Sequence, residues 1–455
     1  MSKNIFREYD IRGIFPSELD EIGVKNIGYY FGLDVKVATS EPHLVTIGYD
    51  ARLHSVKLKD WIVSGLKRAG VECVDIGLVP TPISYYSNYI DIDGRKVSAS
   101  IMITGSHNPP EYNGFKITLD KKPYFGSDIY ALGEKVIDTP VEIEDSFEVE
   151  SFDLESLYVD FIVKNFSHLK LDGRSFIFDS GNGAVGPTLE KILKKLNLEH
   201  KILYKEPDGR FPNHHPDPSE EESLEDIKKE LQTNKYDLGF AYDGDGDRVA
   251  TLSKKHSFKG DILAIFFARA LENPVVIGEV KCSQVMYDEI DKIGKAVMYK
   301  TGHSNLKVKI KELDASFAAE VSGHLFFNDR YYGYDDALYA TFRVLELLES
   351  GLDFDAEINR LPKMYTTDEI NIDVCEDRKF KMIKDLAEAL KNPPSNFPKI
   401  KKIITVDGLR VVFEDGWGLI RASNTTPKLV TRFEAKSKES AELYQNKLLE
   451  LLETN

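Results

Sequence analysis

The sequence contains little cysteine and no long apolar run. Its three cysteines, Cys73, Cys282 and Cys375, lie far apart and are odd in number, which excludes a disulfide framework and a CxxC metal site. The longest apolar segment, 262–271, is interrupted by Arg269 and is about half as long as a bilayer-spanning helix. Because the N-terminus also has no apolar signal region, we expect a protein of the reducing cytoplasm.

Positive charge is scarce as well. The chain has 75 Asp and Glu residues against 59 Lys and Arg residues, which gives a formal net charge of -16. A protein that binds nucleic acids or membranes in general would carry a basic excess, so we expect neither of these partners. An anionic small molecule remains possible as a partner only where cations are concentrated locally.

What the chain does have is a repeated pattern of α/β type. With 455 residues, 42% of them apolar, it is long enough for three or four globular domains. An apolar run of strand length, a turn with acidic residues or glycine and a helical segment recur at 43–55, 174–186, 236–248 and 273–283. This order is typical of βα units, whose ligands gather at the carboxyl ends of the strands.

The C-terminal part follows a different pattern. Residues 402–423 alternate between apolar and polar around Asp-Gly turns, which predicts antiparallel hairpins, and 438–453 predict a closing helix. Further upstream, the acid-rich stretch 141–151 precedes a predicted amphipathic helix with Leu154, Leu157, Tyr158 and Phe161 on one side. These features divide the chain into predicted domains 1–150, 151–253, 254–366 and 367–455, the last of them an α+β module.

Three aspartates are crowded together after a predicted strand. Asp243, Asp245 and Asp247 alternate with glycine, and in extended backbone their carboxylates would point to one side. Three carboxylates on one side suit Mg²⁺, although a solvated acidic turn is the alternative. A calcium EF-hand does not fit, because it needs glycine and glutamate where Arg248 and Lys254 stand.

Three further loops carry polar residues suited to phosphate or sugar chemistry. In 104–116, Ser106 precedes two prolines that would hold its hydroxyl on a stiff, exposed turn, and Lys116 could neutralise phosphate or move a proton. The second loop spaces Glu320, Ser322 and His324 two residues apart, so the first two are expected to face one way and bind neighbouring sugar hydroxyls. Each stretch could also be an ordinary turn. The third loop, 421–435, offers a phosphate cradle of Arg421, Ser423, Asn424, Thr425, Thr426 and Arg432.

Together these loops resemble the α-D-phosphohexomutase family, in particular its bacterial phosphomannomutase/phosphoglucomutase branch. The resemblance runs over essentially the whole chain, from YDIRG (9–13) through TGSHNPPEYNGFK, FPNHHPDP, DGDGDR, EVKCS, KTGHS and EVSGH to RASNTTP. It implies three tandem related α/β domains and a C-terminal α+β domain like the TATA-binding protein, around a central active-site cleft.

The resemblance also implies roles for individual residues. Ser106 would carry the phosphoryl group as phosphoserine and, with the three aspartates, complete the Mg²⁺ site. Glu320 and Ser322 would hold the sugar O3 and O4, and Arg421, Ser423, Asn424 and Thr425 would hold the phosphate that is not transferred. Arg12, Lys116 and His324 are assigned to charge stabilisation and proton movement, and Tyr9, Arg248, Lys281 and His303 match the remaining cleft positions.

The implied activity is intramolecular phosphoryl transfer between hexose 1-phosphates and hexose 6-phosphates. The phosphoserine enzyme would form a glucose or mannose 1,6-bisphosphate that reorients in the cleft, with this bisphosphate also acting as activator. Neither sugar handle reads C2, so glucose and mannose are both acceptable. We expect sugar phosphates as the only small-molecule partners, and a monomer or weak dimer.

Three alternatives stay open. A phosphoglucosamine mutase of the same family usually has Gln where this chain has Val321. A sugar phosphatase of the haloacid dehalogenase type would also start from a D-x-D strand end, but it expects Thr or Val at the position of Asp247. A non-catalytic protein that binds sugar phosphates is the third.

Overall fold

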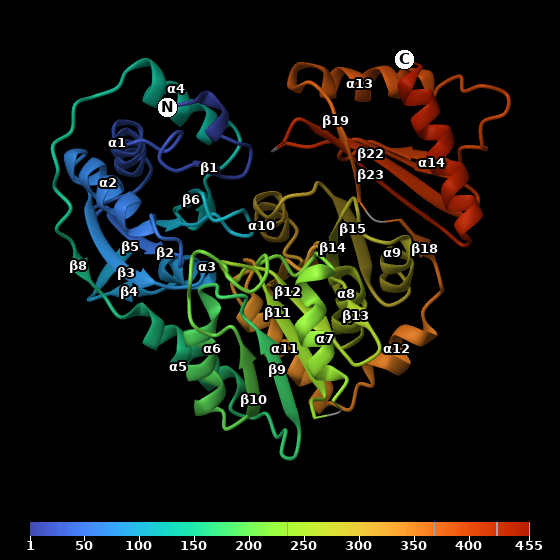
Figure 1. Ribbon diagram of the computed structural model, residues 1–455, viewed down its shortest axis with the longest axis horizontal. Coiled ribbons are helices and arrows are strands. Elements are labelled where there is room, and N and C mark those ends of the chain that lie inside the picture. Colours follow the sequence, from blue (N-terminus) through green and yellow to red (C-terminus); the bar gives the residue numbers. More distant parts are fainter. Residues whose placement is uncertain (234, 368, 425, 455) are drawn as a thin grey trace.

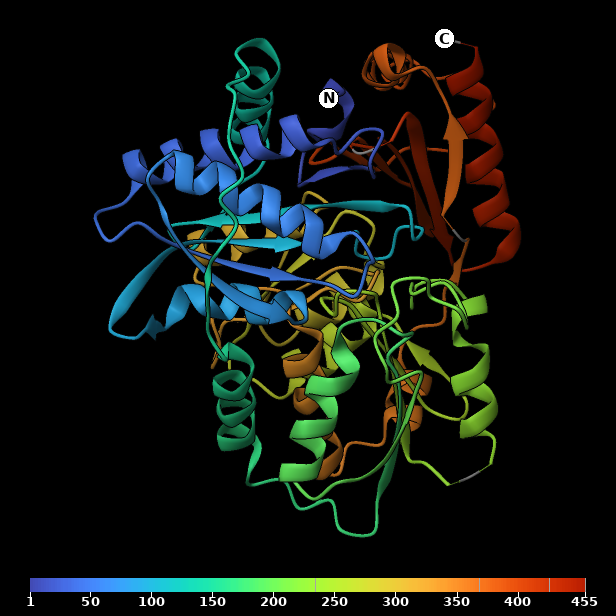
Figure 2. The same cartoon turned by 60° about the vertical axis from the view of Figure 1, so that its left-hand side comes forward.

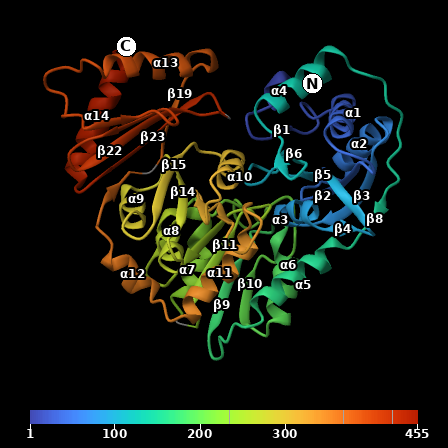
Figure 3. The ribbon, with the colours of Figure 1, turned by 180° about the vertical axis from the view of Figure 1, so that it is seen from behind.

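Four β-sheets follow one another along the chain, each with its own helices (Figure 1). The computed structural model describes residues 1–233, 235–367, 369–424 and 426–454, and within them the sheets have eight, five, four and six strands. We call the parts built on the first three sheets the first, second and third units, and the part built on the last sheet the C-terminal module. The first unit and the C-terminal module lie on opposite sides above the other two units, as the turned and rear views also show (Figure 2, Figure 3).

The first three sheets share one core topology. In each sheet, the first three of these strands along the chain are parallel and the fourth is antiparallel. Across the sheet, the second strand lies next to the first, the first next to the third, and the third next to the fourth. This repetition confirms the prediction of three tandem related α/β units. The equivalent strands are β3 (Glu72–Leu78), β2 (Leu44–Tyr49), β5 (Arg95–Ile103) and β6 (Tyr112–Leu119); β10 (Glu199–Leu203), β9 (Ser175–Asp179), β11 (Leu238–Tyr242) and β12 (Val249–Leu252); and β15 (Lys295–Tyr299), β14 (Val275–Glu279), β16 (Phe317–Ala319) and β17 (Leu325–Phe327).

Further elements extend each of these sheets or cover its faces. Strands such as β11 are buried along their whole length, as expected of parallel strands that are covered on both faces. The first unit adds β1 (Ile11–Ile14), β4 (Asp91–Ile92), β7 (Lys122–Pro123), β8 (Glu150–Ser151), α1 (Glu21–Ala38), α2 (Ser55–Arg68), α3 (Thr81–Tyr86), α4 (Ser127–Asp138), and the short helices η1 (Lys3–Ile5) and η2 (Ser87–Tyr89). The second adds α5 (Leu154–Phe166), α6 (Val185–Lys195), η3 (Glu222–Leu224), α7 (Glu225–Leu231) and β13 (Ser257–Phe258), and the third adds α8 (Gly260–Arg269), α9 (Gln284–Ile290), α10 (His303–Glu312), α11 (Ala337–Glu349) and α12 (Phe354–Arg360).

The C-terminal module is the predicted antiparallel α+β fold. Its helices α13 (Glu376–Ala389) and α14 (Lys438–Glu453) pack on one face of the sheet, and Trp417 and Leu419 on β22 pack against Val280 of the third unit. The closing helix is confirmed together with its buried face of Ala441, Tyr444, Leu448, Leu451 and Leu452. The strands are β18 (Tyr365–Thr366), β19 (Ile370–Asp373), β20 (Lys402–Ile404), β21 (Leu409–Val412), β22 (Gly416–Ala422) and β23 (Lys428–Ala435).

The hydrophobic cores differ between the units and the module. One core cluster runs from α3 of the first unit through the second and third units, whereas the C-terminal module has a core of its own. The module is joined to the third unit through a small separate apolar cluster of Val280, Trp417 and Leu419.

Two sequence expectations need comment here. The helix after the acid-rich stretch exists as α5, but Leu157 is 43% exposed, because the buried face turns toward Tyr158, Ile162 and Phe166. The domain ranges stay predictions: β8 crosses the limit at residue 150, and β13 pairs with β12 although it follows residue 253.

No helix in the described ranges is both long enough and apolar enough to cross a membrane.

Candidate active site

A cavity of about 240 Å³ lies where the first three units and the C-terminal module meet. The predicted residues that line it are Tyr9, Arg12, Ser106, Lys116, Arg248, His303, His324 and Thr426. A larger cavity of about 680 Å³ is lined by Ser322 and Lys281 together with Arg432 and Glu369. Residues that are hundreds of positions apart in the sequence thus converge on one region of the molecule.

The three aspartates meet in a turn. Strand β11 ends at Tyr242, and the following residues are not extended, so the predicted geometry was wrong although the predicted convergence holds. Oδ1 of Asp243 accepts the backbone N–H groups of Gly246, Asp247 and Arg248 at 3.0–3.1 Å, which folds the loop around this carboxylate. The aspartate side chains are completely buried, and their ligand atoms lie within 4.8 Å of one another.

Glycine is required in this loop because the chain passes close to the serine loop. A Cβ atom at Gly244 would lie 2.5 Å from the carbonyl oxygen of Ser106, well inside the contact distance of real atoms. The spacing of the aspartates by glycine therefore serves the approach of the two loops.

The buried negative charge is partly compensated by Lys116. Its ammonium group contacts Asp247 and lies 2.7 Å from Oδ2 of Asp245, to which the hydroxyl of Thr81 also donates at 2.6 Å. Burial opposes the ionisation of Asp245, but the charge of Lys116 outweighs it and lowers the pKa of this carboxyl group. Burial and the two neighbouring carboxylates raise the pKa of Asp243 well above its usual range.

Ser106 points at this cluster. Its hydroxyl donates to Oδ2 of Asp243 at 3.0 Å, its backbone adopts φ = 50°, and its N–H donates to the hydroxyl oxygen of Thr104 at 2.7 Å. The residue is only 3% exposed, so the prediction of an exposed turn was wrong, while the prediction of a stiff turn agrees with its many contacts. The serine hydroxyl and the acidic cluster form one group of contacting atoms.

Arg52 holds the serine loop in place, and the sequence analysis missed it. The buried guanidinium donates to the carbonyl oxygens of Ser106 and Tyr112 at 2.9 Å, and to those of Asn108 and Pro109 at 2.5 Å. Its only sequence signal is its place in the first βα turn, DAR at 50–52, which did not separate it from other surface arginines.

Two more guanidinium groups contact residues beside Ser106. Arg12 donates to the carbonyl oxygen of Gly105 at 2.9 Å and to the side chain of Asn108 at 2.6 Å. Arg248 contacts His107 and lies 3.3 Å from Oδ2 of Asp243, and burial lowers its pKa to about 10. Two buried guanidinium groups therefore lie next to the serine loop, without the exposure that is usual for arginine.

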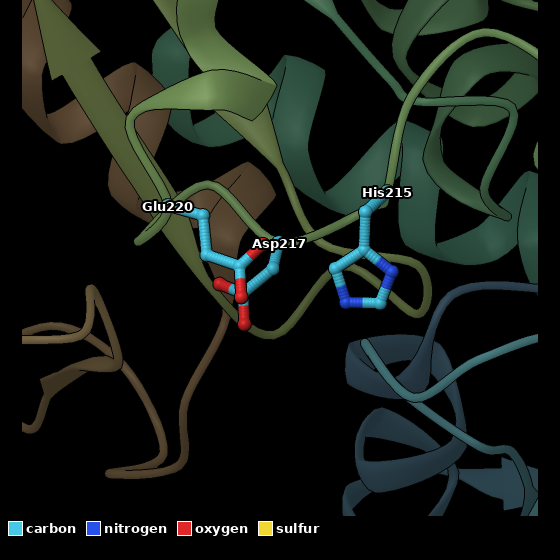
Figure 4. Close-up of side chains that lie close together, drawn as sticks. All are labelled: His215, Asp217 and Glu220. Atoms are coloured by element: carbon cyan, nitrogen blue, oxygen red, sulfur yellow. The ribbon is translucent and has the colours of Figure 1, made fainter. Parts of the chain in front are cut away.

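A second acidic group comes from the segment 215–220. Figure 4 shows the carboxylates of Asp217 and Glu220 close together, with the ring of His215 beside them. Oδ1 of Asp217 already accepts from the N–H and hydroxyl groups of Ser219 at 2.9 and 2.6 Å, and from Arg248 at 3.4 Å. Asp217 thus acts as an acceptor that orients Arg248, and we assign no metal to this group.

The predicted sugar loop makes a turn at Val321 and Ser322, so the expected extended geometry was wrong. Glu320 is 4% exposed, and its Oε1 accepts the N–H of Gly302 at 2.6 Å, whereas Ser322 lines the larger cavity. The rings of His324 and His303 stack with their centres 5.7 Å apart.

The two histidines differ in their electrostatic environment. Burial and the nearby Lys307 lower the pKa of His303 well below its usual value. Burial also opposes the charged form of His324, but Asp247 and Asp335 outweigh it and raise its pKa. The two stacked rings thus favour different protonation states.

The C-terminal loop reaches the same region. Arg421 is 5% exposed and its Nε donates to Asp407 at 3.0 Å, while Asn424 donates to the hydroxyl of Tyr9 at 2.8 Å. That hydroxyl donates in turn to the carbonyl oxygen of Thr301 at 2.8 Å. Ser423 is buried beside them. Thr425 lies outside the described residues.

Lys281 stands apart from the serine loop and lines the larger cavity. Its ammonium group lies 3.1 Å from Glu369 and 3.8 Å from Glu279, whose negative charges outweigh burial and raise its pKa. Burial raises the pKa of Glu279 to about 7. This lysine remains charged beside a cavity that is large enough for a small ligand.

Four family models match the chain in order. They are the alpha/beta/alpha domains I, II and III and the C-terminal domain of phosphoglucomutase/phosphomannomutase, and they match residues 3–132, 156–256, 259–365 and 369–451.

Individual relatives are similar over their whole length. The chain is 38% identical to the phosphomannomutase/phosphoglucomutase of Pseudomonas aeruginosa, over 96% of this chain and 93% of that protein. It is 37% identical to the phosphoglucomutase of Neisseria gonorrhoeae, over 100% of this chain and 98% of that protein. A crystal structure of a phosphoglucomutase/phosphomannomutase family protein from Burkholderia thailandensis matches with a TM-score of 0.90 and 36% identity, over 100% of this chain and 98% of that one.

Proposed function

Because the chain belongs to the phosphoglucomutase/phosphomannomutase family, we propose that it interconverts the 1-phosphates and 6-phosphates of glucose, mannose or both. The observation that carries this proposal is the position of Ser106. Its hydroxyl lies 3.0 Å from Asp243, and Ser106 lines a cavity together with cationic side chains that include Arg12, Lys116 and Arg248. This arrangement suits a serine that accepts and returns a phosphoryl group.

The acidic cluster fits a magnesium ion. Oδ1 of Asp245 and Oδ1 of Asp247 are buried oxygens without a hydrogen-bond partner, and hard carboxylate oxygens are the ligands that Mg²⁺ prefers. The raised pKa of Asp243 reflects a repulsion that a divalent cation would relieve. We therefore assign Mg²⁺ to Asp243, Asp245 and Asp247, with an oxygen on Ser106 as a further ligand. The ion would supply charge that stabilises the transferring phosphoryl group.

The side chains around Ser106 divide the remaining work. Arg12 and Arg248 face the serine hydroxyl and neutralise phosphate oxygens, while Lys116 and His324 hold or move the proton of the attacking sugar hydroxyl. Phosphoserine gives its group to one end of the hexose phosphate, and the resulting hexose 1,6-bisphosphate turns so that its other end returns a phosphoryl group to Ser106.

Turning requires handles that work in both orientations. We propose that Glu320 and Ser322, together with His303, bind the sugar hydroxyls. Arg421, Ser423 and Asn424 would bind the phosphate that is not being transferred, with Tyr9 and Lys281 beside it; Thr425 is proposed for the same role from the sequence alone. Sugar phosphates are the proposed partners, and a monomer or weak dimer in the cytoplasm remains our expectation.

Parallel assays of three substrates test the proposal. Mannose 1-phosphate, glucose 1-phosphate and glucosamine 1-phosphate are each given with Mg²⁺ and a trace of glucose 1,6-bisphosphate, and formation of the 6-phosphate yields kcat/KM. We expect the mannose and glucose substrates to be used within about tenfold of each other, a difference of about 1.4 kcal/mol, and glucosamine 1-phosphate to be a poorer substrate. Preference for glucosamine would instead identify the phosphoglucosamine mutase.

Two observations distinguish the other candidates. Release of inorganic phosphate without a 6-phosphate would identify a phosphatase, and binding of all three sugars without any product would identify a binding protein. Acid-stable phosphate on Ser106, found by peptide mass spectrometry after incubation with the bisphosphate, would support the mutase, whereas an acyl phosphate labile to hydroxylamine would contradict it.

A further inference from the structure

Asp335 lies directly behind the two histidines of the cavity. It is completely buried between β17 and α11, and its Oδ2 lies 2.9 Å from Nδ1 of His324 and 3.8 Å from Nδ1 of His303. Asp335 itself is not among the residues that line the cavity. It can therefore reach a substrate only through the imidazole rings in front of it.

Lys307 fixes the other side of this carboxylate. Its ammonium group lies 2.8 Å from Oδ1 of Asp335, and it also sits over the ring of Tyr85, 3.7 Å from the centre. Lys307 follows His303 by four positions on α10, so both side chains project from one face of that helix. The ammonium group stabilises a buried charge that would otherwise be costly.

We propose that Asp335, held by Lys307, is a positioning residue that fixes the imidazole of His324. With Oδ1 occupied by the lysine, Oδ2 accepts the Nδ1 proton of His324 and keeps the ring from rotating. Nε2 is then directed toward Glu320, whose Oε2 lies 3.9 Å away, on the side where the proposed substrate binds. The inference rests on the proposed function in that His324 is taken to act on the sugar.

A metal is a less suitable explanation for the same contacts. Asp247, His324 and Asp335 offer ligand atoms within 4.8 Å of one another. However, the oxygens of Asp335 already lie 2.8 Å from an ammonium group and 2.9 Å from an imidazole nitrogen, so positive charge from the protein itself faces this carboxylate.

The decisive variant is Asp335→Asn, which keeps the shape of the side chain. The amide oxygen should stay on the Lys307 ammonium, so the amide N–H₂ group would face His324 and require an unprotonated Nδ1. Nitrogen-15 spectra of the histidine side chains read this directly, because the chain has only 10 histidines. We expect Nδ1 of His324 to be protonated in the wild type and unprotonated in the variant.

Kinetics provide the second readout. Asp335→Asn should lower kcat at least about tenfold while KM changes by less than about threefold, as for other partners that orient a catalytic group. In a His324→Gln background, assayed at high enzyme concentration, Asp335→Asn should lower kcat by less than about twofold, because Asp335 acts through His324. Lys307→Met should behave in the same way and serves as the second variant if Asp335→Asn does not fold.

Asp336→Asn is the matched control. Asp336 is the equally buried neighbour, but it accepts from the hydroxyls of Tyr158 and Tyr331 and caps α11 through the N–H of Tyr339, away from the cavity. It should lower the melting temperature without changing kcat. Three outcomes would each overturn the positioning role. The first is an equal loss of kcat for both aspartate variants, and the second is a loss of kcat on Asp335→Asn that persists in the His324→Gln background. The third is an Nδ1 proton of His324 that stays in place in Asp335→Asn.

These outcomes are separable from a failure of the proposed function. The nitrogen-15 readout needs no turnover, so it tests the contact even in a protein without mutase activity. An unchanged Mg²⁺ requirement in Asp335→Asn is expected, and a rise of more than about tenfold would overturn the inference in favour of metal ligation.

Discussion

The serine–aspartate region and the phosphate loop of the C-terminal module are built in opposite ways. Around Ser106, buried charges from the first and second units contact one another directly, and Arg52 alone donates to four carbonyl oxygens of the serine loop. Near the site, the C-terminal module is bonded to the other units by Asn424, which donates to the hydroxyl of Tyr9, and by Asp407, which accepts the N–H of Thr301. The serine–aspartate region is thus held by several buried charged contacts, whereas the described contacts of the phosphate loop with the other units are separate hydrogen bonds.

A firm attachment of the C-terminal module lies at Arg410. There, Arg410 is fully buried, lies 3.8 Å from the ring centre of Trp417, and donates to the carbonyl oxygens of Val280 and Cys282 at 2.6 and 2.7 Å. These two carbonyls flank Lys281. We expect a module that is anchored beside Lys281 to move relative to Tyr9 when a sugar phosphate enters the site.

Removal of the serine hydroxyl tests the serine–aspartate region and should have the largest effect. Ser106→Ala is expected to lower kcat by more than about 10³-fold, because the group that carries the phosphoryl is gone. Calorimetric titration with glucose 1-phosphate should still give a Kd near the wild-type value, since the C-terminal loop is intact. Turnover close to wild type would show that another residue is the nucleophile.

Asp245→Asn tests the proposed magnesium site. We expect activity to fall about 10²-fold and the Mg²⁺ concentration for half activation to rise, because a charged ligand is replaced by an amide. Asp217→Asn is a useful comparison, since Asp217 belongs to the second acidic group, to which we assign no metal. If Asp245→Asn keeps the Mg²⁺ requirement of the wild type, the assignment of the metal to this cluster is wrong.

Arg421→Ala tests the phosphate loop of the C-terminal module. The guanidinium is assigned to the phosphate that is not transferred, so we expect KM to rise about 10- to 100-fold with a smaller change in kcat. Steady-state assays with glucose 1-phosphate measure both constants. An unchanged KM would remove this arginine from the phosphate site.

The charge cluster should also give a pH-dependent response to magnesium. Because the pKa of Asp243 and that of Asp247 are raised in the folded protein, their protonated forms stabilise it at low pH, and this stability is lost as pH rises through the raised values. Mg²⁺ should offset the loss, so it should raise the melting temperature more at pH 8 than at pH 5. An equal increase at both pH values would argue against metal binding by these carboxylates.

The smallest effect is expected for Tyr9→Phe. This change removes two hydrogen bonds, to Thr301 and from Asn424, at a site that water can reach once the module opens. We expect KM to rise about threefold, which is within the range of one ordinary hydrogen bond, and kcat to stay near wild type. A large loss of kcat would mean that Tyr9 acts together with the serine–aspartate region instead.

Much of this organisation could be predicted from the sequence. The recurring βα pattern predicted the tandem units, and the apolar positions of 438–453 predicted the buried face of α14. Asp243, Asp245 and Asp247 were recognisable because charge crowded at that density is unusual without a cation. Arg52 and Asp335 were not recognisable, because one arginine in a turn and one aspartate before a helix look like many others.

The sequence by itself determined which side chains carry the chemistry and in which kind of element each stands, because periodicity and local charge are properties of neighbouring residues. Only the tertiary structure decided that Ser106 is buried against Asp243, that Lys116 and not solvent faces the aspartates, and that Asp335 stands behind two histidines. These contacts join positions that are far apart in the chain. They depend on how the sheets pack against one another, and a local sequence pattern does not encode this packing.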